Sequence, residues 1–203
     1  FFEGYGDNRE LHACPTRRSS DLRLTAPEAV GWQPNWRPLG DAIAYSSNAD
    51  GRLDIPAQEI FIMDSQGRHT TQVTGRPGAA DPNWHPHRST IAFASWDAGH
   101  NGDVYTINAD GSDEQRLTKH PAADRKPRWS PDGTQILFES RRDGQLGLFI
   151  MEVDGHIVRK VTDERFTWVE GSSWFDPDVR RSISPVGKHA TTWGWMKRLG
   201  SRR

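Results

Sequence analysis

Three histidines are the side chains in this sequence best placed to do metal chemistry. His85 and His87 lie two residues apart, and His120 occupies a similar place further along the chain. Imidazole nitrogens are common ligands of zinc and other transition metals. On a short strand, however, alternation would point one of the first two toward solvent and leave the other in a turn, without shared ligand geometry. We therefore expect no metal and no cofactor; a metal centre built on these histidines is the alternative.

The local sequence also argues against a nucleophile. A serine hydrolase places its serine on a Gly-x-Ser-x-Gly elbow, and Gly111-Ser112-Asp113 and Gly171-Ser172-Ser173 both lack the second glycine. Residues 108–113 offer too few oxygen ligands for a calcium loop and are predicted to form a hairpin turn. The single cysteine, Cys14, precedes the regular part of the sequence, so that part has no thiol. The sequence predicts no catalytic residue.

Net charge and hydropathy exclude two classes of partner. Residues 23–178 carry 16 basic and 23 acidic side chains, a net charge of −7, and seven basic residues follow Asp178. Nucleic-acid surfaces need clustered positive charge, which an acidic body does not supply. No apolar run approaches the roughly 18 residues that cross a bilayer. We expect neither nucleic-acid binding nor a membrane span.

The first 22 residues do not share the patterns of the rest. They lack an initiator methionine and any strand or helix period that continues downstream. Arg18-Ser19-Ser20-Asp21-Leu22 resembles the peptide obtained when a sequencing adapter is translated in frame. We expect residues 1–22 to be a disordered, non-native leader; a genuine disordered leader is the alternative.

The elements that position the polar residues follow from an internal repeat of about 44 residues. A tryptophan recurs in register at Trp36, Trp84, Trp129 and Trp174. A turn segment recurs in the same phase and ends at Gly67, Gly111 and Gly155. A closing pair recurs as Val73-Thr74, Leu117-Thr118 and Val161-Thr162. Three motifs in one phase indicate a structural repeat, and the first three tryptophans are predicted to be core wedges.

Each repeat is predicted to form four short strands. The first carries the tryptophan and leads into a turn such as residues 130–133, Ser-Pro-Asp-Gly, where glycine accepts the left-handed exit. In the second strand Ile136 and Phe138 share one face and Leu137 takes the other, so both faces are apolar. The third strand carries an aromatic residue and ends in a hairpin turn, and the fourth ends at the closing pair. A sheet of this kind must be covered on both sides.

Radial stacking of such four-stranded antiparallel sheets gives a β-propeller, so the predicted fold class is all-β. The residues Trp129-Ser130-Pro131-Asp132-Gly133, with Phe149-Ile150-Met151 and Val161-Thr162, resemble the WD-like blade of the TolB family, periplasmic propellers of the Tol-Pal envelope system. The resemblance covers Arg23 to about Asp176. The first two repeats depart from the turn motif at residues 37–41 and 85–88.

About three full blades and a partial one are expected. The full blades are predicted over residues 31–74, 79–118 and 124–162, and Arg23-Leu24-Thr25 matches the closing motif of a further unit. TolB-like rings usually have six blades, so the resemblance implies part of a six-bladed ring. A closed four-bladed ring that uses residues 166–197 is the alternative. The predicted organisation is a leader over 1–22, blades over 23–178, and a basic tail or closing strands over 179–203.

The resemblance implies a non-enzymatic scaffold of the bacterial envelope, periplasmic or extracellular, that binds a protein or peptide at the channel mouth. The candidate binding residues lie on or beside the innermost strands: Asp81, Asn83, His85, Asp124, Arg125 and Arg128. One alternative is a propeller lyase or hydrolase with a channel metal. Another is the propeller portion of a prolyl oligopeptidase-like peptidase whose catalytic domain is absent. Uncovered faces on the end blades predict self-association.

Overall fold

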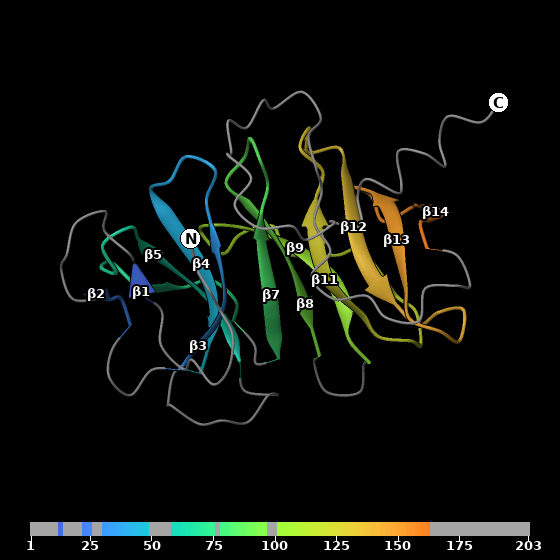
Figure 1. The fold of residues 1–203 in the computed structure, drawn as a ribbon, viewed down its shortest axis with the longest axis horizontal. Coiled ribbons are helices and arrows are strands. Elements are labelled where there is room, and N and C mark those ends of the chain that lie inside the picture. Colours follow the sequence, from blue (N-terminus) through green and yellow to red (C-terminus); the bar gives the residue numbers. More distant parts are fainter. Residues whose placement is uncertain are drawn as a thin grey trace, which may run out of the picture.

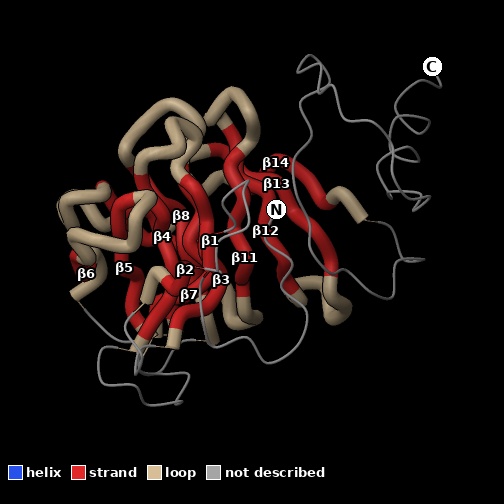
Figure 2. The backbone as a smooth tube through the Cα atoms, turned by 60° about the vertical axis from the view of Figure 1, so that its left-hand side comes forward, coloured by secondary structure: helices blue, strands red, loops and turns tan. Residues whose placement is uncertain are grey.

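The computed structural model describes residues 12–13, 22–25, 30–48, 58–75, 78–96 and 101–162. These ranges contain strands and loops (Figure 2). Three four-stranded antiparallel sheets follow one another along the chain (Figure 1). The predicted all-β blades are therefore confirmed. Over the same ranges, no helix has the length and apolar character needed to cross a membrane.

The strand bounds agree with the predicted repeats. The first blade consists of β3 (Gly31–Trp36), β4 (Ala42–Ser47), β5 (Glu59–Asp64) and β6 (Thr71–Gln72). The second consists of β7 (Ala79–Trp84), β8 (Thr90–Ser95), β9 (Asp103–Asn108) and β10 (Gln115–Arg116). The third consists of β11 (Asp124–Trp129), β12 (Gln135–Ser140), β13 (Gly147–Glu152) and β14 (Ile157–Lys160). In every sheet the spatial order of the strands equals their order in the chain.

The first strand of each blade lies at the edge nearest its neighbours. β7 packs against β3 and β4, and β11 packs against β7 and β8. We call β3, β7 and β11 the inner strands. Because the blades repeat one topology, the inner strands all begin at one end of the molecule and finish at the other.

Glycines in the left-handed region make the predicted turns. Gly133, at φ 73°, donates its backbone N–H to Ser130 over 2.9 Å and closes the turn after β11. Gly155, at φ 87°, donates to Glu152 over 3.0 Å and closes the hairpin between β13 and β14. This backbone conformation is strained for residues with a Cβ, which accounts for the repeated glycines in the sequence.

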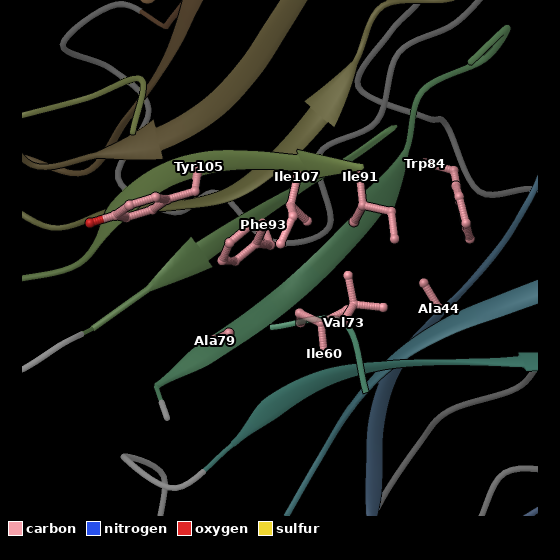
Figure 3. Packing of buried hydrophobic residues seen from close by; sticks show 9 residues of the cluster. All are labelled: Ala44, Ile60, Val73, Ala79, Trp84, Ile91, Phe93, Tyr105 and Ile107. Carbon is pink, nitrogen blue, oxygen red and sulfur yellow. The ribbon is translucent and has the colours of Figure 1, made fainter. Parts of the chain in front are cut away.

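The apolar alternation of the second strands divides the core between adjacent blades. Ala44 packs with Ile91 and Phe93 between the first and second blades (Figure 3). Ala92, on the opposite face of β8, packs with Phe138 between the second and third blades. The second sheet thus buries its two faces against two different blades, as the sequence predicts.

The recurrent tryptophans are not equally buried. Trp84 and Trp129 are 4% and 8% exposed and act as wedges between blades, as predicted. Trp36, at the matching position of the first blade, is 36% exposed, so its prediction as a core wedge is wrong. The physical reason is that Trp84 and Trp129 each receive cover from the preceding blade. The guanidinium of Arg37, for example, lies 5.5 Å from the centre of the Trp84 ring.

The closing motif joins strands within a blade and supports the next blade. The hydroxyl oxygens of Thr74, Thr118 and Thr162 accept backbone N–H groups of the third strands at 3.0–3.1 Å. The residue before the threonine packs against the hairpin glycine of the following blade. A Cβ added at Gly111 would lie 3.2 Å from the Val73 carbonyl oxygen, and one at Gly155 would overlap the Leu117 carbonyl oxygen.

Leu24 occupies the same place against the first blade. A Cβ added at Gly67 would lie 2.6 Å from the Leu24 carbonyl oxygen, and Leu24 packs with Ile43, Tyr45 and Met63. The predicted match of residues 23–25 to a closing motif is therefore reproduced in space. β2 (Leu22–Arg23) pairs with β1 (His12–Ala13), so one strand pair crosses the boundary predicted after residue 22.

The far face of the third blade differs from the bare apolar surface that the sequence predicts. Leu137, Leu148 and Ile150 on this face are 2–7% exposed. The prediction of an uncovered face is wrong at this position. Trp174, the predicted last blade over 166–197 and the basic tail over 179–203 lie outside the described residues.

Candidate binding site on the inner strands

Every inner strand contains a bulge three residues before its tryptophan. Gln33, Asp81 and Lys126 occupy this position with φ of 53°, 57° and 52°, and each precedes a proline. The strand register shifts at the same place in all three blades. A left-handed conformation costs a residue with a Cβ about 1–2 kcal/mol, so surrounding contacts must hold it. The bulge redirects one polar side chain in each blade.

The side chain at this position in the first blade accepts a hydrogen bond from the second blade. Oε1 of Gln33 accepts the Asp81 backbone N–H over 3.0 Å and the Ser46 hydroxyl over 2.9 Å. The backbone N–H of Lys126 in turn lowers the pKa of the Asp81 carboxyl group, against the larger effect of burial. The bulges of the first and second blades are thereby linked, because the side chain of one accepts the backbone N–H of the other.

Asn83, one of the predicted binding residues, forms a similar link. Its Oδ1 accepts the backbone N–H of Trp129 over 2.8 Å, and Asn35 does the same for Trp84 over 2.9 Å. An N–H buried between blades without a partner would cost about 1–3 kcal/mol. The position before each tryptophan therefore contributes to blade packing.

His85, another predicted residue, lies between the second and third blades. Its ring centre is 4.6 Å from that of Trp129 in an edge contact, and Nε2 lies 3.2 Å from the Gly133 carbonyl oxygen. Nδ1 accepts the backbone N–H of His87 over 3.0 Å, so Nε2 is the donor to Gly133. Burial, with a smaller effect of Arg88, lowers the pKa of His85. The neutral imidazole thus uses both nitrogens in structural contacts.

The three histidines are not assembled as a metal centre. The His85 and His87 ring centres are 6.1 Å apart, and Nδ1 of His120 accepts the Ala122 backbone N–H over 3.0 Å. Within the described ranges, no group of three or more His, Cys, Asp or Glu side chains is placed to hold one metal ion.

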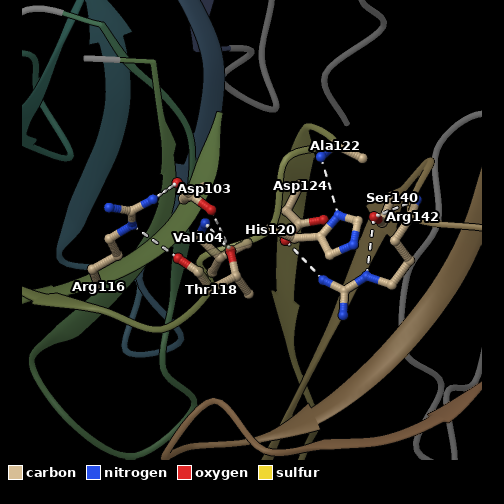
Figure 4. Close-up of polar contacts among 9 residues, drawn as sticks. All are labelled: Asp103, Val104, Arg116, Thr118, His120, Ala122, Asp124, Ser140 and Arg142. Carbon is tan, nitrogen blue, oxygen red and sulfur yellow. Dashed lines mark hydrogen bonds and ion pairs between the residues drawn. The ribbon is translucent and has the colours of Figure 1, made fainter. Parts of the chain in front are cut away.

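Asp124, at the start of β11, forms a buried ion pair. It is fully buried, and its Oδ2 accepts from the Arg142 guanidinium over 2.8 Å (Figure 4). Nε of Arg142 also donates to the Ser140 hydroxyl over 3.2 Å, and the guanidinium lies 4.9 Å from the Phe138 ring centre. Asp103 is held in a comparable way by Arg116 and Thr118. Asp124 therefore anchors the β12–β13 loop to the inner strand.

A charge cluster surrounds the bulge of the third blade. Asp81 and Glu139 are 4% and 2% exposed, and burial raises the pKa of both carboxyl groups against the opposing effect of nearby cations. Nζ of Lys126 lies 3.4 Å from Oε2 of Glu139. Arg128 is close to both carboxylates, but burial still lowers its pKa. Arg125 is the register partner of Glu139 across the β11–β12 ladder.

The predicted site residues therefore fall into two sets. Asp81, Arg125 and Arg128 come together in the charge cluster, whereas Asn83, His85 and Asp124 stabilise contacts within and between blades. Sequence reasoning missed Lys126 and Glu139. The repeat register contained a signal for Lys126, because it matches Gln33 and Asp81 three residues before the tryptophan.

Comparison with known proteins supports the same family as the blade motif. The chain is 29% identical over 145 residues to a TolB homolog of Chlorobium luteolum, which covers 71% of the chain and 32% of that protein. It is 32% identical over 106 residues to an uncharacterized peptidase of Bacillus subtilis, covering 51% of the chain and 16% of the peptidase.

Solved structures give the same fold. TolB of Acinetobacter baumannii superposes with a TM-score of 0.64 at 22% identity, over 76% of the chain and 38% of that protein. An oligogalacturonate lyase in complex with manganese superposes with a TM-score of 0.59 at 16% identity, over 78% of the chain and 49% of the lyase.

The chain thus spans less than half of the length of each of these proteins. The family model of the TolB beta propeller domain matches residues 58–180, which is more than half of the chain. Together with the three sheets and their repeated interfaces, this match shows that the chain belongs to the TolB beta propeller domain family.

Proposed function

We propose that the chain is a non-enzymatic binding scaffold of the bacterial envelope, periplasmic or extracellular, that presents the start of its inner strands to a protein or peptide. Membership of the TolB family supports this reading. The observation that carries it is the repeated bulge, because three blades use the same strained backbone to redirect one polar side chain at matching positions.

Such a bulge suits recognition because it lies on packed strands. Side chains on strands keep a more precise geometry than side chains on loops. The side chain of Lys126 is 34% exposed, so this position is open to solvent in the third blade. Rigid placement lowers the entropy lost when a partner is bound.

Two of the predicted binding residues, His85 and Asp124, support structure in the described ranges. Both ring nitrogens of His85 contact backbone groups, and Asp124 is paired with Arg142. These bonds favour packing roles over a lyase or hydrolase centre. They are consistent with a scaffold whose function is to bind.

A second candidate function is the propeller portion of a peptidase. The specific observation is the similarity to the uncharacterized peptidase of Bacillus subtilis. In that case the blades would act beside a hydrolytic domain. Co-expression of this chain with a peptidase domain, followed by cleavage of proline-containing peptides, would distinguish this function from autonomous binding.

The proposed function is tested by retention on the immobilised chain. A periplasmic extract is passed over the wild type, over Lys126→Glu, and over the matched control Arg159→Glu. Arg159 is exposed on the outermost strand β14. We expect one saturable partner, identified by mass spectrometry and then titrated in pure form, that loses binding to Lys126→Glu alone. Equal retention by all three proteins, or substrate turnover that copurifies with the chain, would contradict the proposal.

A further inference from the structure

The inner strand of the third blade differs from the other two inner strands at the two positions whose side chains face the following blade. At three residues and one residue before the tryptophan, the first two blades carry Gln33 and Asn35, then Asp81 and Asn83. The side chains of Gln33, Asn35 and Asn83 accept backbone N–H groups from the following blade. The third blade carries Lys126 and Arg128 at these positions. Lysine and arginine side chains only donate, so they cannot make the same bonds.

A third cation precedes them and contains an unused donor. Nε of Arg125 is buried and has no hydrogen-bond partner within the described residues. Buried donors are normally satisfied, so each exception requires an explanation. Arg125, Lys126 and Arg128 form the sequence of one strand, which we call the cationic strand.

The acidic groups beneath the cationic strand do not neutralise it fully. Asp81 and Glu139 are the buried carboxylates beside these cations, and Glu139 already contacts Lys126 through Oε2. Two carboxylates therefore face three cations, and the carboxylates are covered whereas the side chain of Lys126 is 34% exposed. The excess is positive although residues 23–178 have a net charge of −7.

We propose that the cationic strand binds an acidic segment of a partner protein, with Arg125 and Lys126 as the residues that contact its carboxylates. The inference rests on the proposed binding function and specifies the chemistry of the partner. The terminal N–H groups of a guanidinium can donate hydrogen bonds to a carboxylate, and a lysine ammonium adds a mobile point charge. Arg128 interacts electrostatically with both buried carboxylates and is not assigned a contact with the partner.

The proposal is tested by fluorescence anisotropy of labelled hexapeptides. Acetylated hexaglutamate is titrated with the full chain, and hexaglutamine serves as the uncharged control. We expect hexaglutamate to bind and hexaglutamine not to bind. Arg125→Gln and Lys126→Gln should each lower the affinity for hexaglutamate at least about tenfold, because a charge-assisted hydrogen bond is lost. Arg159→Gln removes the same charge from β14 and should leave affinity unchanged.

Folding and ligand size are controlled separately. Lys126→Arg keeps the charge and should retain most binding. Far-UV circular dichroism spectra of the glutamine variants that match the wild type would exclude unfolding as the cause of a loss. Free glutarate should displace labelled hexaglutamate poorly. If glutarate displaced it at the same concentration as unlabelled hexaglutamate does, the cationic strand would be a site for small anions and the proposal would be overturned. Equal binding by Arg125→Gln, Lys126→Gln and the wild type would also overturn it. If the periplasmic partner binds but hexaglutamate does not, the binding function stands and only the acidic specificity fails.

Discussion

Replacement of Trp129 by alanine should destabilise the chain far more than the same replacement of Trp36, although the sequence places both at one repeat position. Trp129 is 8% exposed, packs with Phe138 and Ile136, and receives the edge of His85 at 4.6 Å. Truncation of a buried aromatic residue typically costs about 3–5 kcal/mol. We expect Trp129→Ala to fall in this range.

The expected difference between the two variants follows from exposure. Trp36 is 36% exposed and Trp129 is 8% exposed. The difference corresponds to roughly 60 Å² of additional buried aromatic surface at Trp129, which contributes about 1.5 kcal/mol at 25 cal/mol/Å². A cavity between blades adds to the cost at Trp129 because the rigid sheets relax only in part. Trp36→Ala should therefore cost at least about 1.5 kcal/mol less.

Urea denaturation followed by far-UV circular dichroism measures both free energies of unfolding without relying on tryptophan fluorescence. The slopes with urea must agree among variants, so that a shifted midpoint reports stability. Trp129→Phe keeps most of the buried aromatic side chain and should lose less stability than Trp129→Ala. A loss below about 1 kcal/mol for Trp129→Ala, or equal losses for Trp36→Ala and Trp129→Ala, would refute the wedge assignment.

Three further measurements test other contacts. Gly155→Ala and Gly144→Ala both place a Cβ at positive φ, which costs about 1–2 kcal/mol, but only at Gly155 does that Cβ overlap the Leu117 carbonyl oxygen. Thermal denaturation should therefore show a clearly larger loss of stability for Gly155→Ala. Equal losses would contradict the packing of this hairpin against Leu117. Asn83→Ala should lower the free energy of unfolding, measured in urea, by about 1–3 kcal/mol because the Trp129 N–H loses its acceptor. Asn83→Asp keeps an acceptor and should cost less. The reverse order would show that this hydrogen bond does not stabilise the fold. Burial raises the folded-state pKa of Asp81, so its contribution is fully present below the unfolded pKa and is lost as pH rises through the folded pKa. Relative to Asp81→Asn, wild-type stability should fall as the pH rises above about 4. A relative rise would show that the cations dominate.

Local sequence determined the blades. The alternation of Ile136, Leu137 and Phe138 predicts two apolar faces because side chains alternate across a strand, and the structure divides them between two clusters. The turn glycines predicted the strand ends because a positive φ is strained for other residues, and Gly133 and Gly155 both have it. These features depend on neighbours within a few residues, so a sequence contains them directly.

Contacts between blades were decided only by the tertiary structure. Asn83 reads as a binding residue in the sequence, but it accepts from Trp129, 46 residues away. Lys126 and Glu139 went unnoticed because their roles depend on Asp81 in the preceding blade. Trp36 and Trp129 share one motif, yet their exposure differs because cover comes from the preceding blade and not from the motif itself. A repeat fixes what each blade offers to its neighbours, but burial and hydrogen bonding depend on which residues the neighbouring blade places opposite.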